Sequence, residues 1–165
     1  IFSKGDKNSN YTVTFPHNKG SYAETYRVKD NAGKTRFLKL INYSKVNRWQ
    51  MDDKGTVREI EIFKQLTHSN LCKYIDSDSI MENGGQLAYL VTEFISGETL
   101  SQRIIRAGTL NVYEIKQIAK SVLSALDYCT LNHCLSFIMK LQLECNVNLV
   151  GGLQELKIDR LRSCV

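Results

Sequence analysis

Two residues of opposite charge, Lys39 and Glu59, have the types and the setting for phosphate chemistry. Lys39 lies at the centre of an expected strand, where a cation can pair with phosphates, and Glu59 lies on an expected helix, where a carboxylate can hold that lysine in place. Each residue also has a simpler interpretation. Lys39 alone fits an exposed strand position, and Thr56-Val-Arg-Glu59 fits a helix capping box, in which the acid only satisfies a backbone N–H.

A second feature is the glycine-containing stretch NKGSYAETY, Asn18 to Tyr26. A strand, a turn with a glycine and a second strand form a cover whose backbone N–H groups can approach phosphates, provided that the side chains there are small. The same pattern also fits an ordinary hairpin turn, so the stretch alone does not define a site.

The elements that would carry these residues follow from hydrophobic patterns and turn signals. Runs rich in Thr, Tyr and Val predict an antiparallel meander of three strands, and apolar spacing then predicts a helix that ends near Leu66. Two more strands follow, separated by the turn signal MENGGQ, and the second is nearly all apolar and therefore expected to be buried. The five expected strands are Tyr11–Phe15, Glu24–Val28, Arg36–Ile41, Leu71–Ile75 and Leu87–Ile95.

Helices are expected in the next part of the chain. A short helix should end at Gly108. Asn111 then offers an N-cap with Glu114 three residues later, and apolar positions recur at helical steps from Ile115 to Leu126. This stripe should be buried against a large surface. A last strand is expected at Leu153–Ile158.

Composition limits the classes of partner. With 165 residues, 42% of them hydrophobic and 24% charged, the chain resembles one globular domain. The net charge of +5 comes from 22 basic and 17 acidic residues that are spread along the chain, so no nucleic-acid partner is expected. No apolar run reaches the roughly 18 residues of a membrane span, and no signal peptide is visible, so we expect no membrane contact and a cytoplasmic location.

The cysteine residues predict neither a disulfide scaffold nor a complete zinc site. The five Cys residues form no C-x-x-C pair, and their odd number argues against a disulfide scaffold. Cys129, His133 and Cys134 could belong to a zinc site, but a fourth ligand at a familiar spacing is missing.

Taken in order, these pieces resemble the protein kinase family over about residues 11–128. Asn18, Gly20 and Ala23 match the family's glycine-rich loop, and Lys39 matches the lysine of its third strand.

The resemblance continues in two later segments. Arg58–Leu71 looks like the family's third-helix segment, with Glu59 as the acid of its ion pair, and Leu87–Leu100 resembles strand five and the hinge. Thr92 would guard the back of the pocket. The residues expected at the adenine edge are Glu93, Phe94 and Ile95.

The resemblance implies an α+β fold, in which a small lobe with a five-stranded antiparallel sheet and one helix is followed by helices of an incomplete large lobe. Residues 1–95 would form the small lobe with the hinge at its end, and residues 96–128 the first large-lobe helices. Residues 129–165 would be a remnant of the catalytic loop and the metal-binding strand.

The resemblance also implies ATP and Mg²⁺ as cofactors, a protein substrate or partner protein, and transfer of the terminal phosphoryl group of ATP to Ser or Thr. Lys39 and Glu59 would be the catalytic pair, and Asn146 and Asp159 the metal ligands. The residues expected to contact the nucleotide are Asn18, Lys19, Gly20, Ser21, Tyr22, Ala23, Thr25, Lys39, Thr92, Glu93, Phe94 and Ile95.

The chain departs from the family pattern in its cover and pocket. Asn18 replaces the first loop glycine, which Asn tolerates because it accepts left-handed backbone geometry. Ala23 adds a methyl group where phosphate should approach most closely, and Phe37 stands where the family has a small Ala above adenine. A weaker nucleotide affinity and a tight or differently shaped pocket are therefore expected.

The larger departure concerns the catalyst. In the family the long helix is followed by H-R-D-x-x-x-x-N, whose Asp positions the substrate hydroxyl and whose Asn holds a metal ion. If Asn146 is that Asn, Leu141 stands where the Asp belongs, and leucine cannot accept a proton. The metal-binding D-F-G is also missing, because the chain reads DRLR from Asp159.

A shift of the reading frame explains these missing motifs better than substitution. Back-translation of residues 128–142, started from the last base of the Tyr128 codon, allows Leu-His-Ser-Lys-Pro-Leu-Pro-Ile-Ile-His-Asn-Glu-Ile-Thr, with His-Asn-Glu in place of H-R-D. Codons for Asp159 to Ser163 (GAT AGA CTT CGG TCA), read one base later, give Ile-Asp-Phe-Gly. Sequencing the encoding DNA tests this hypothesis, since codons that forbid both motifs in the neighbouring frames would exclude it.

The sequence thus predicts a fragment of an ATP-binding protein kinase domain that is inactive as written. One alternative is a non-catalytic, kinase-like scaffold that binds nucleotide or a partner protein. Another is a fragment that does not stay folded, because the helix from Asn111 to Tyr128 would expose its apolar stripe.

Overall fold

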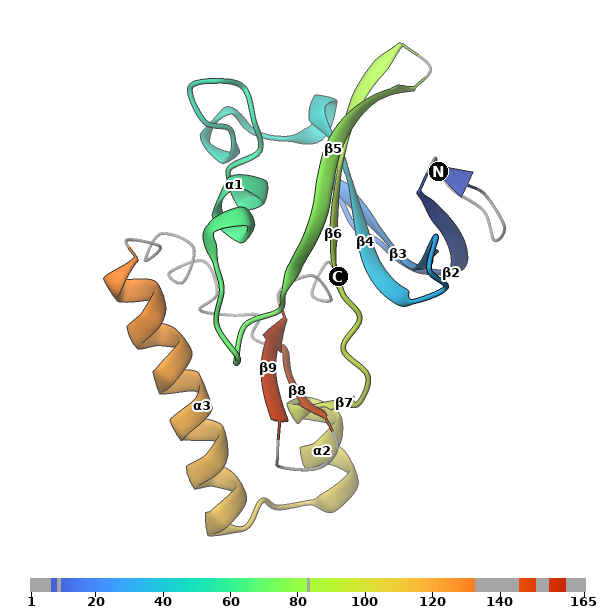
Figure 1. Cartoon of the computed structure of the whole chain (residues 1–165). Helices are drawn as coiled ribbons and strands as arrows, with labels where there is room; N and C mark the ends of the chain where they lie inside the picture. Colours follow the sequence, from blue (N-terminus) through green and yellow to red (C-terminus); the bar gives the residue numbers. More distant parts are fainter. Residues whose placement is uncertain (1–6, 9, 83, 133–145, 151–154, 160–165) are drawn as a thin grey trace. The chain divides into compact units, whose positions relative to one another are not determined.

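The computed structural model describes residues 7–8, 10–82, 84–132, 146–150 and 155–159 (Figure 1). The chain divides into two compact units: the first extends to Gln65 and includes Tyr74–Phe94, and the second consists of Leu66–Lys73 and Ile95–Ser163. The elements of the first unit are β1 Lys7–Asn8, β2 Tyr11–Lys19, β3 Ala23–Asp30, β4 Thr35–Asn42, η1 Tyr43–Lys45, η2 Arg48–Gln50, α1 Arg58–Gln65, β5 Tyr74–Glu82 and β6 Gly85–Glu93. Those of the second unit are β7 Glu98–Thr99, α2 Leu100–Ala107, α3 Val112–Leu131, β8 Asn146–Val150 and β9 Glu155–Asp159.

The first unit is built on an antiparallel sheet with the strand order β1-β2-β3-β4-β6-β5. Strands β2 to β6 match the expected five in number and order, and the two-residue strand β1 adds a sixth at the edge. Strands β4 and β6 lie inside the sheet and are buried along most of their length, which explains their continuous apolar runs. The turn before β4 follows its sequence signal, because Asp30 accepts backbone N–H groups of Ala32 and Lys34 and Gly33 adopts φ 77°.

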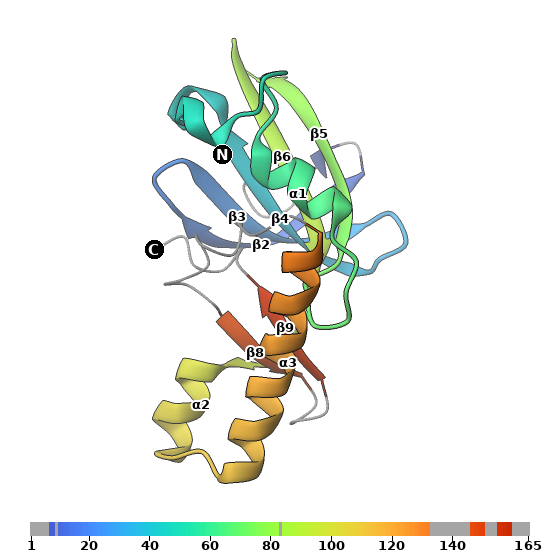
Figure 2. The same cartoon turned by 90° about the vertical axis from the view of Figure 1, so that its left-hand side faces the viewer.

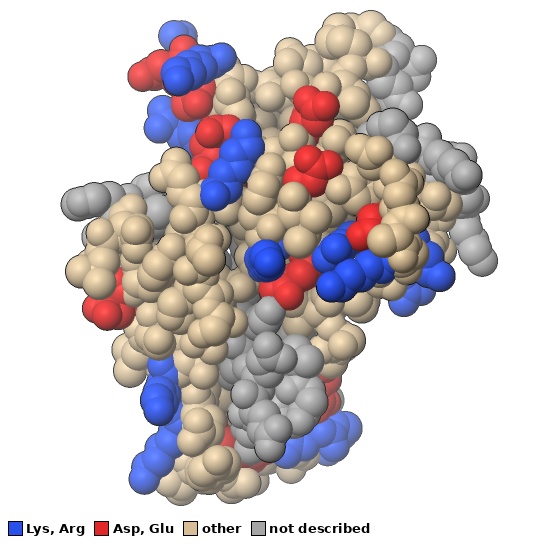
Figure 3. Space-filling model, in the orientation of Figure 1, with Lys and Arg blue, Asp and Glu red and all other residues tan. Residues whose placement is uncertain are grey.

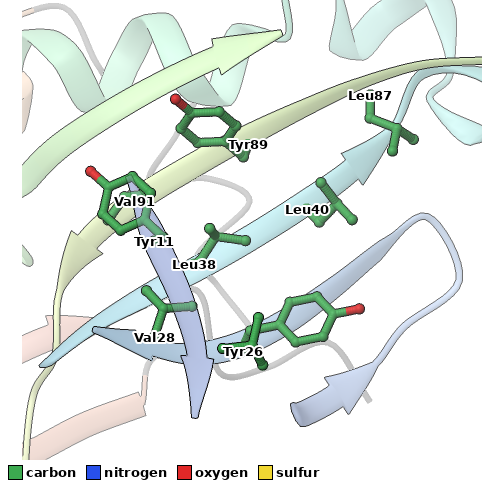
Figure 4. Close-up of a cluster of buried hydrophobic side chains, with 9 residues drawn as sticks. Tyr11, Tyr26, Val28, Leu38, Leu40, Leu87, Tyr89 and Val91 are labelled. Atoms are coloured by element: carbon green, nitrogen blue, oxygen red, sulfur yellow. The ribbon is translucent and has the colours of Figure 1, made fainter. Parts of the chain in front are cut away.

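One face of this sheet carries a hydrophobic core (Figure 4). Side chains alternate along a strand, so Leu38 and Leu40 of β4 share this face with Tyr89 of β6. Tyr11 also lies here, and its hydroxyl donates to Asp76 at 3.0 Å. Burial, together with the nearby Asp76 carboxylate, raises the pKa of Tyr89 to about 12. The full cluster comprises Tyr11, Val13, Tyr26, Val28, Leu38, Leu40, Leu87, Tyr89 and Val91.

The opposite face of β4 carries Phe37, Lys39 and Ile41, which are all buried. Helix α1 buries Ile60 and Phe63, and Figure 2 shows it in front of the sheet. The alternation within a single strand therefore separates the hydrophobic core on one face from the one buried lysine of the described residues on the other.

The expected strand at Leu71–Ile75 is wrong in position, since β5 spans Tyr74–Glu82. Leu71 and Cys72 are instead buried in the connection before β5. The sequence did not indicate this strand, because β5 lies at the edge of the sheet and contains the mostly polar run IDSDSI. A continuous run of apolar residues, which would have predicted a buried strand, is missing there.

The second unit contains helices α2 and α3 and a small sheet with the order β7-β8-β9. Residues Leu66–Lys73 belong to it through α3: the Thr67 N–H donates to the Tyr128 hydroxyl at 2.9 Å, and the rings of His68 and Tyr128 lie 5.1 Å apart. The expected N-cap of α3 is confirmed, because the Asn111 side chain accepts the Glu114 N–H and the Glu114 carboxylate accepts the Asn111 N–H, both at 2.9 Å.

The described surface shows no segregation of charge on the face in Figure 3, where acidic and basic side chains are interspersed. Among the described residues, no helix has both the length and the apolar character that crossing a bilayer requires.

Protonation of Glu114 should weaken the second unit. The Arg103 guanidinium, followed by the Asn111 N–H, holds the pKa of this carboxyl below its usual value of 4.5. A carboxyl with a lowered folded-state pKa stabilises the fold above its unfolded pKa, and the contribution disappears as the pH falls through the folded pKa. We expect Glu114→Gln to lower the free energy of unfolding at neutral pH and to have little effect once the pH is below the folded pKa. Urea unfolding of both proteins at neutral and acidic pH, followed by circular dichroism, measures this. A difference that does not change with pH would contradict it.

Candidate functional site

The geometric centre of the candidate site is the ion pair between Lys39 and Glu59. The Lys39 Nζ atom lies 2.9 Å from Glu59 Oε1 and 3.0 Å from Oε2, so both carboxylate oxygens accept from one ammonium. Lys39 is 1% exposed and Glu59 is 9% exposed. The interpretation of Lys39 as an exposed strand residue is therefore wrong. The Glu59 carboxylate binds the Lys39 ammonium, which a residue of a helix capping box does not need to do.

The sheet register decides which other candidates share a face with Lys39. Residues directly opposite one another on neighbouring strands point to the same side, and Lys39 lies opposite Thr25 of β3 and Leu90 of β6. Thr92 lies on the same face, two residues after Leu90, and Ala23 lies two residues before Thr25. All of these side chains are buried.

The glycine-containing stretch forms a closed turn between β2 and β3. The Gly20 N–H donates to the Ala23 carbonyl at 2.8 Å, and the Asn42 N–H of β4 donates to the Tyr22 carbonyl at 3.1 Å. The hydroxyl of Tyr22 accepts from Lys39 Nζ at 3.3 Å. This turn therefore contacts Lys39 through a side chain.

Other candidates in this stretch lie differently. Lys19 is largely exposed, and its ammonium pairs with Glu24 at 3.4 Å. Glu24 is adjacent to Thr25 in β3, so it belongs to the face opposite Lys39. Ser21 is exposed. Asn18 is the exception, because its register opposite Thr25 places it on the Lys39 side of the sheet. The structure thus brings Tyr22, Ala23 and Thr25, but not the Lys19 ammonium, to the Lys39 face.

Near the beginning of β4, Phe37 is 1% exposed and lies opposite Thr92 of β6. Arg27, which lies opposite Phe37 on β3, places its guanidinium 6.0 Å from the ring centre of Phe94. Glu93 ends strand β6 and lies opposite Arg36. Ile95, the last of the expected adenine-edge residues, is buried and belongs to the second unit.

The two candidate metal ligands meet in the second unit. Asn146 begins β8 and Asp159 ends β9, and the register makes them direct partners across this hairpin. An amide and a carboxylate are oxygen donors of the kind that Mg²⁺ accepts. The segment with Leu141 lies outside the described residues, as do the residues that follow Asp159 and the candidate zinc ligands His133 and Cys134.

Sequence reasoning missed Arg27 and Asn42 as neighbours of the site. The period of two along β3 could have placed Arg27 on the same face as Thr25. The hydrogen bond from the Asn42 N–H to the Tyr22 carbonyl involves only backbone atoms, so the residue types could not predict it. A surface cavity of about 200 Å³ lies elsewhere in the first unit, and none of the candidate site residues lines it. Its lining residues are Tyr43, Thr56, Ile60, Glu61, Lys64, Ser77, Asp78, Ser79 and Ala88.

Known proteins with similar sequences are protein kinases. The chain is 32% identical over 112 residues to calcium-dependent protein kinase 5 of Plasmodium berghei (strain Anka), which covers 67% of this chain and 18% of that protein. It is 28% identical over 124 residues to serine/threonine-protein kinase cds1 of Schizosaccharomyces pombe, which covers 73% of this chain and 26% of that protein. The chain therefore spans less than a third of the length of either relative.

Solved structures show the same fold. Rad53 1-466 in complex with AMP-PNP matches 92% of this chain and 38% of its own, with a TM-score of 0.67 and 18% identity. A mutant kinase domain of Mycobacterium tuberculosis PknI matches 98% of this chain and 63% of its own, with a TM-score of 0.66 and 19% identity. The family model described as "Protein kinase domain" matches residues 18–140, which is most of the sequence. On this match, and on the shared fold, the chain belongs to the protein kinase family.

Proposed function

We propose that this chain is a fragment of a serine/threonine protein kinase domain. With the present sequence, it binds ATP with Mg²⁺ but does not transfer the phosphoryl group. The observation that carries the proposal is the buried ion pair between Lys39 and Glu59. A lysine held by a carboxylate beneath a glycine-containing turn is a positioned cation that can bind nucleotide phosphates.

The roles of the other first-unit residues follow from the sheet register, and those of Ile95, Asn146 and Asp159 in the second unit follow from the resemblance to protein kinases. Lys39 would contact the phosphates, and the turn at Gly20 would cover them with backbone N–H groups. Thr92, Glu93 and Phe94 would border adenine together with Ile95. Asn146 and Asp159 would hold Mg²⁺, whose chemistry is to neutralise phosphate charge. Because ATP is the proposed ligand, we retain a cytoplasmic location as part of the proposal.

The proposed lack of turnover rests on the sequence. Leu141 cannot position a substrate hydroxyl, and binding without a positioned nucleophile gives little rate enhancement. We propose that residues 129–165 are read out of frame, so that an intact relative would carry the catalytic loop and act on a protein substrate.

A second candidate function is a non-catalytic scaffold that binds a partner protein. Exposed apolar side chains on α2 and α3 favour it, among them Ile105, Tyr113 and Leu123. A scaffold of this kind could retain or lose nucleotide binding.

Calorimetric titration with Mg-ATP, followed by an assay of phosphoryl transfer to a general protein substrate, tests the proposal. We expect saturable binding with no transfer above the rate in buffer. The absence of binding by a folded chain would exclude the nucleotide role and leave the scaffold. Transfer of phosphate would contradict the proposed inactivity.

A further inference from the structure

Within the part of the chain that the structure describes, three acceptor atoms lie within hydrogen-bond distance of the Lys39 ammonium. Two are the oxygens of Glu59 at 2.9 and 3.0 Å, and the third is the hydroxyl of Tyr22 at 3.3 Å. A phosphate oxygen that approaches Lys39 must therefore compete with these acceptors for the N–H donors of the ammonium. The Tyr22 hydroxyl is the weaker of the two partners, because it is neutral and its contact is longer.

We infer that Tyr22 competes with nucleotide phosphate for Lys39 and thereby lowers the affinity of the chain for ATP. This inference rests on the proposed function and reverses the role expected for Tyr22, which the sequence assigned to the nucleotide contacts. Tyr22 acts through Lys39 and is therefore a positioning residue.

The backbone around Tyr22 makes the competition effective. Its carbonyl is held by the Asn42 N–H at 3.1 Å, and the turn beside it is closed by the Gly20 N–H and the Ala23 carbonyl. The Tyr22 ring centre lies 5.1 Å from Lys39 Nζ, which adds a cation–π attraction to the hydrogen bond. Since the competing hydroxyl belongs to the same chain and its backbone is already ordered, it acts at a high effective concentration. Rotation of the side chain alone can release Lys39.

Mg-ATP titration of Tyr22→Phe tests the competition. Phenylalanine keeps the ring over the ammonium and removes only the oxygen, so the dissociation constant should fall by about fivefold, the equivalent of one ordinary hydrogen bond. Tyr74→Phe is the matched control, because its hydroxyl contacts Ser77 on β5, and it should leave the affinity unchanged. An equal or weaker affinity of Tyr22→Phe would overturn the inference, because the hydroxyl would then be neutral toward the nucleotide or help to bind it.

A second measurement does not depend on nucleotide. Acetic anhydride labelling of lysines, read by peptide mass spectrometry, should modify Lys39 faster in Tyr22→Ala than in the wild-type chain, with the exposed Lys64 as internal reference. Unchanged labelling of Lys39 would overturn the inference even if no variant binds ATP. Faster labelling without ATP binding would support the Tyr22 contact and contradict the proposed function, so the two failures are distinguishable.

Discussion

Lys39→Met should lower the free energy of unfolding of the first unit by about 3–5 kcal/mol. The substitution removes the ammonium and leaves the Glu59 carboxylate, only 9% exposed, without its cation. The loss is large because an unpaired buried charge retains its desolvation penalty and has no ion pair to offset it. Urea unfolding followed by tryptophan fluorescence, with Trp49 as the single tryptophan of the chain and part of the first unit, measures the change.

The chain provides a matched control for this prediction. Lys64 pairs with Glu61 at 2.8 Å, almost the same distance, but the two side chains are 41% and 39% exposed. Lys64→Met should therefore change stability by less than about 1 kcal/mol. The double variant Lys39→Met, Glu59→Leu should recover most of the lost stability, because two apolar side chains replace two charges. Equal losses in Lys39→Met and Lys64→Met would show that the buried pair has no special role in the fold.

Phe37→Ala should have an effect of similar size. Phe37 is 1% exposed in the central strand β4, and truncation of a buried Phe to Ala costs about 3–5 kcal/mol through lost burial and the cavity that remains. Phe15→Ala is the control, because Phe15 is 53% exposed, and it should cost about 1 kcal/mol or less. The same urea titration measures both. A small loss in Phe37→Ala would mean that neighbouring side chains collapse into the space.

The Phe37 variant also bears on the expectation of a tight nucleotide pocket. Phe37 lies opposite Thr92 and on the face of β4 that carries Lys39. If its ring narrows the adenine side, Phe37→Ala should bind Mg-ATP more tightly at a temperature where it remains folded. An unchanged affinity would place the ring outside the nucleotide contacts.

The sequence predicted the parts of this molecule that depend on strong local rules. The cap of α3 depends only on Asn111 and Glu114, which lie three residues apart, so the sequence predicted it. The residue type of Lys39 alone fitted an exposed strand position, so its burial needed the structure. The Lys39–Glu59 contact joins residues far apart in the sequence. Residue types and expected elements suggested that Glu59 could hold Lys39, and the resemblance to protein kinases made this pairing specific. Such a contact depends on how α1 lies on the sheet, which residue types alone do not determine.

The failures have identifiable physical causes. Strand β5 was misplaced because a polar edge strand lacks the apolar alternation of a half-buried one. Lys19 was expected among the nucleotide contacts from the resemblance, and the structure pairs its ammonium with Glu24, on the face of β3 opposite Lys39. The contact between Tyr22 and Lys39 requires a specific turn geometry, so no spacing rule could assign it.

The central claim is that the Lys39 ammonium is the phosphate contact of this chain. Calorimetric titration of the double variant Lys39→Met, Glu59→Leu with Mg-ATP tests it most directly, because this variant should retain its fold while lacking only the charged pair. We predict that the wild-type chain binds Mg-ATP and that the folded double variant binds at least about tenfold more weakly, a loss of about 1.4 kcal/mol. Equal affinities of the two folded proteins would contradict the claim.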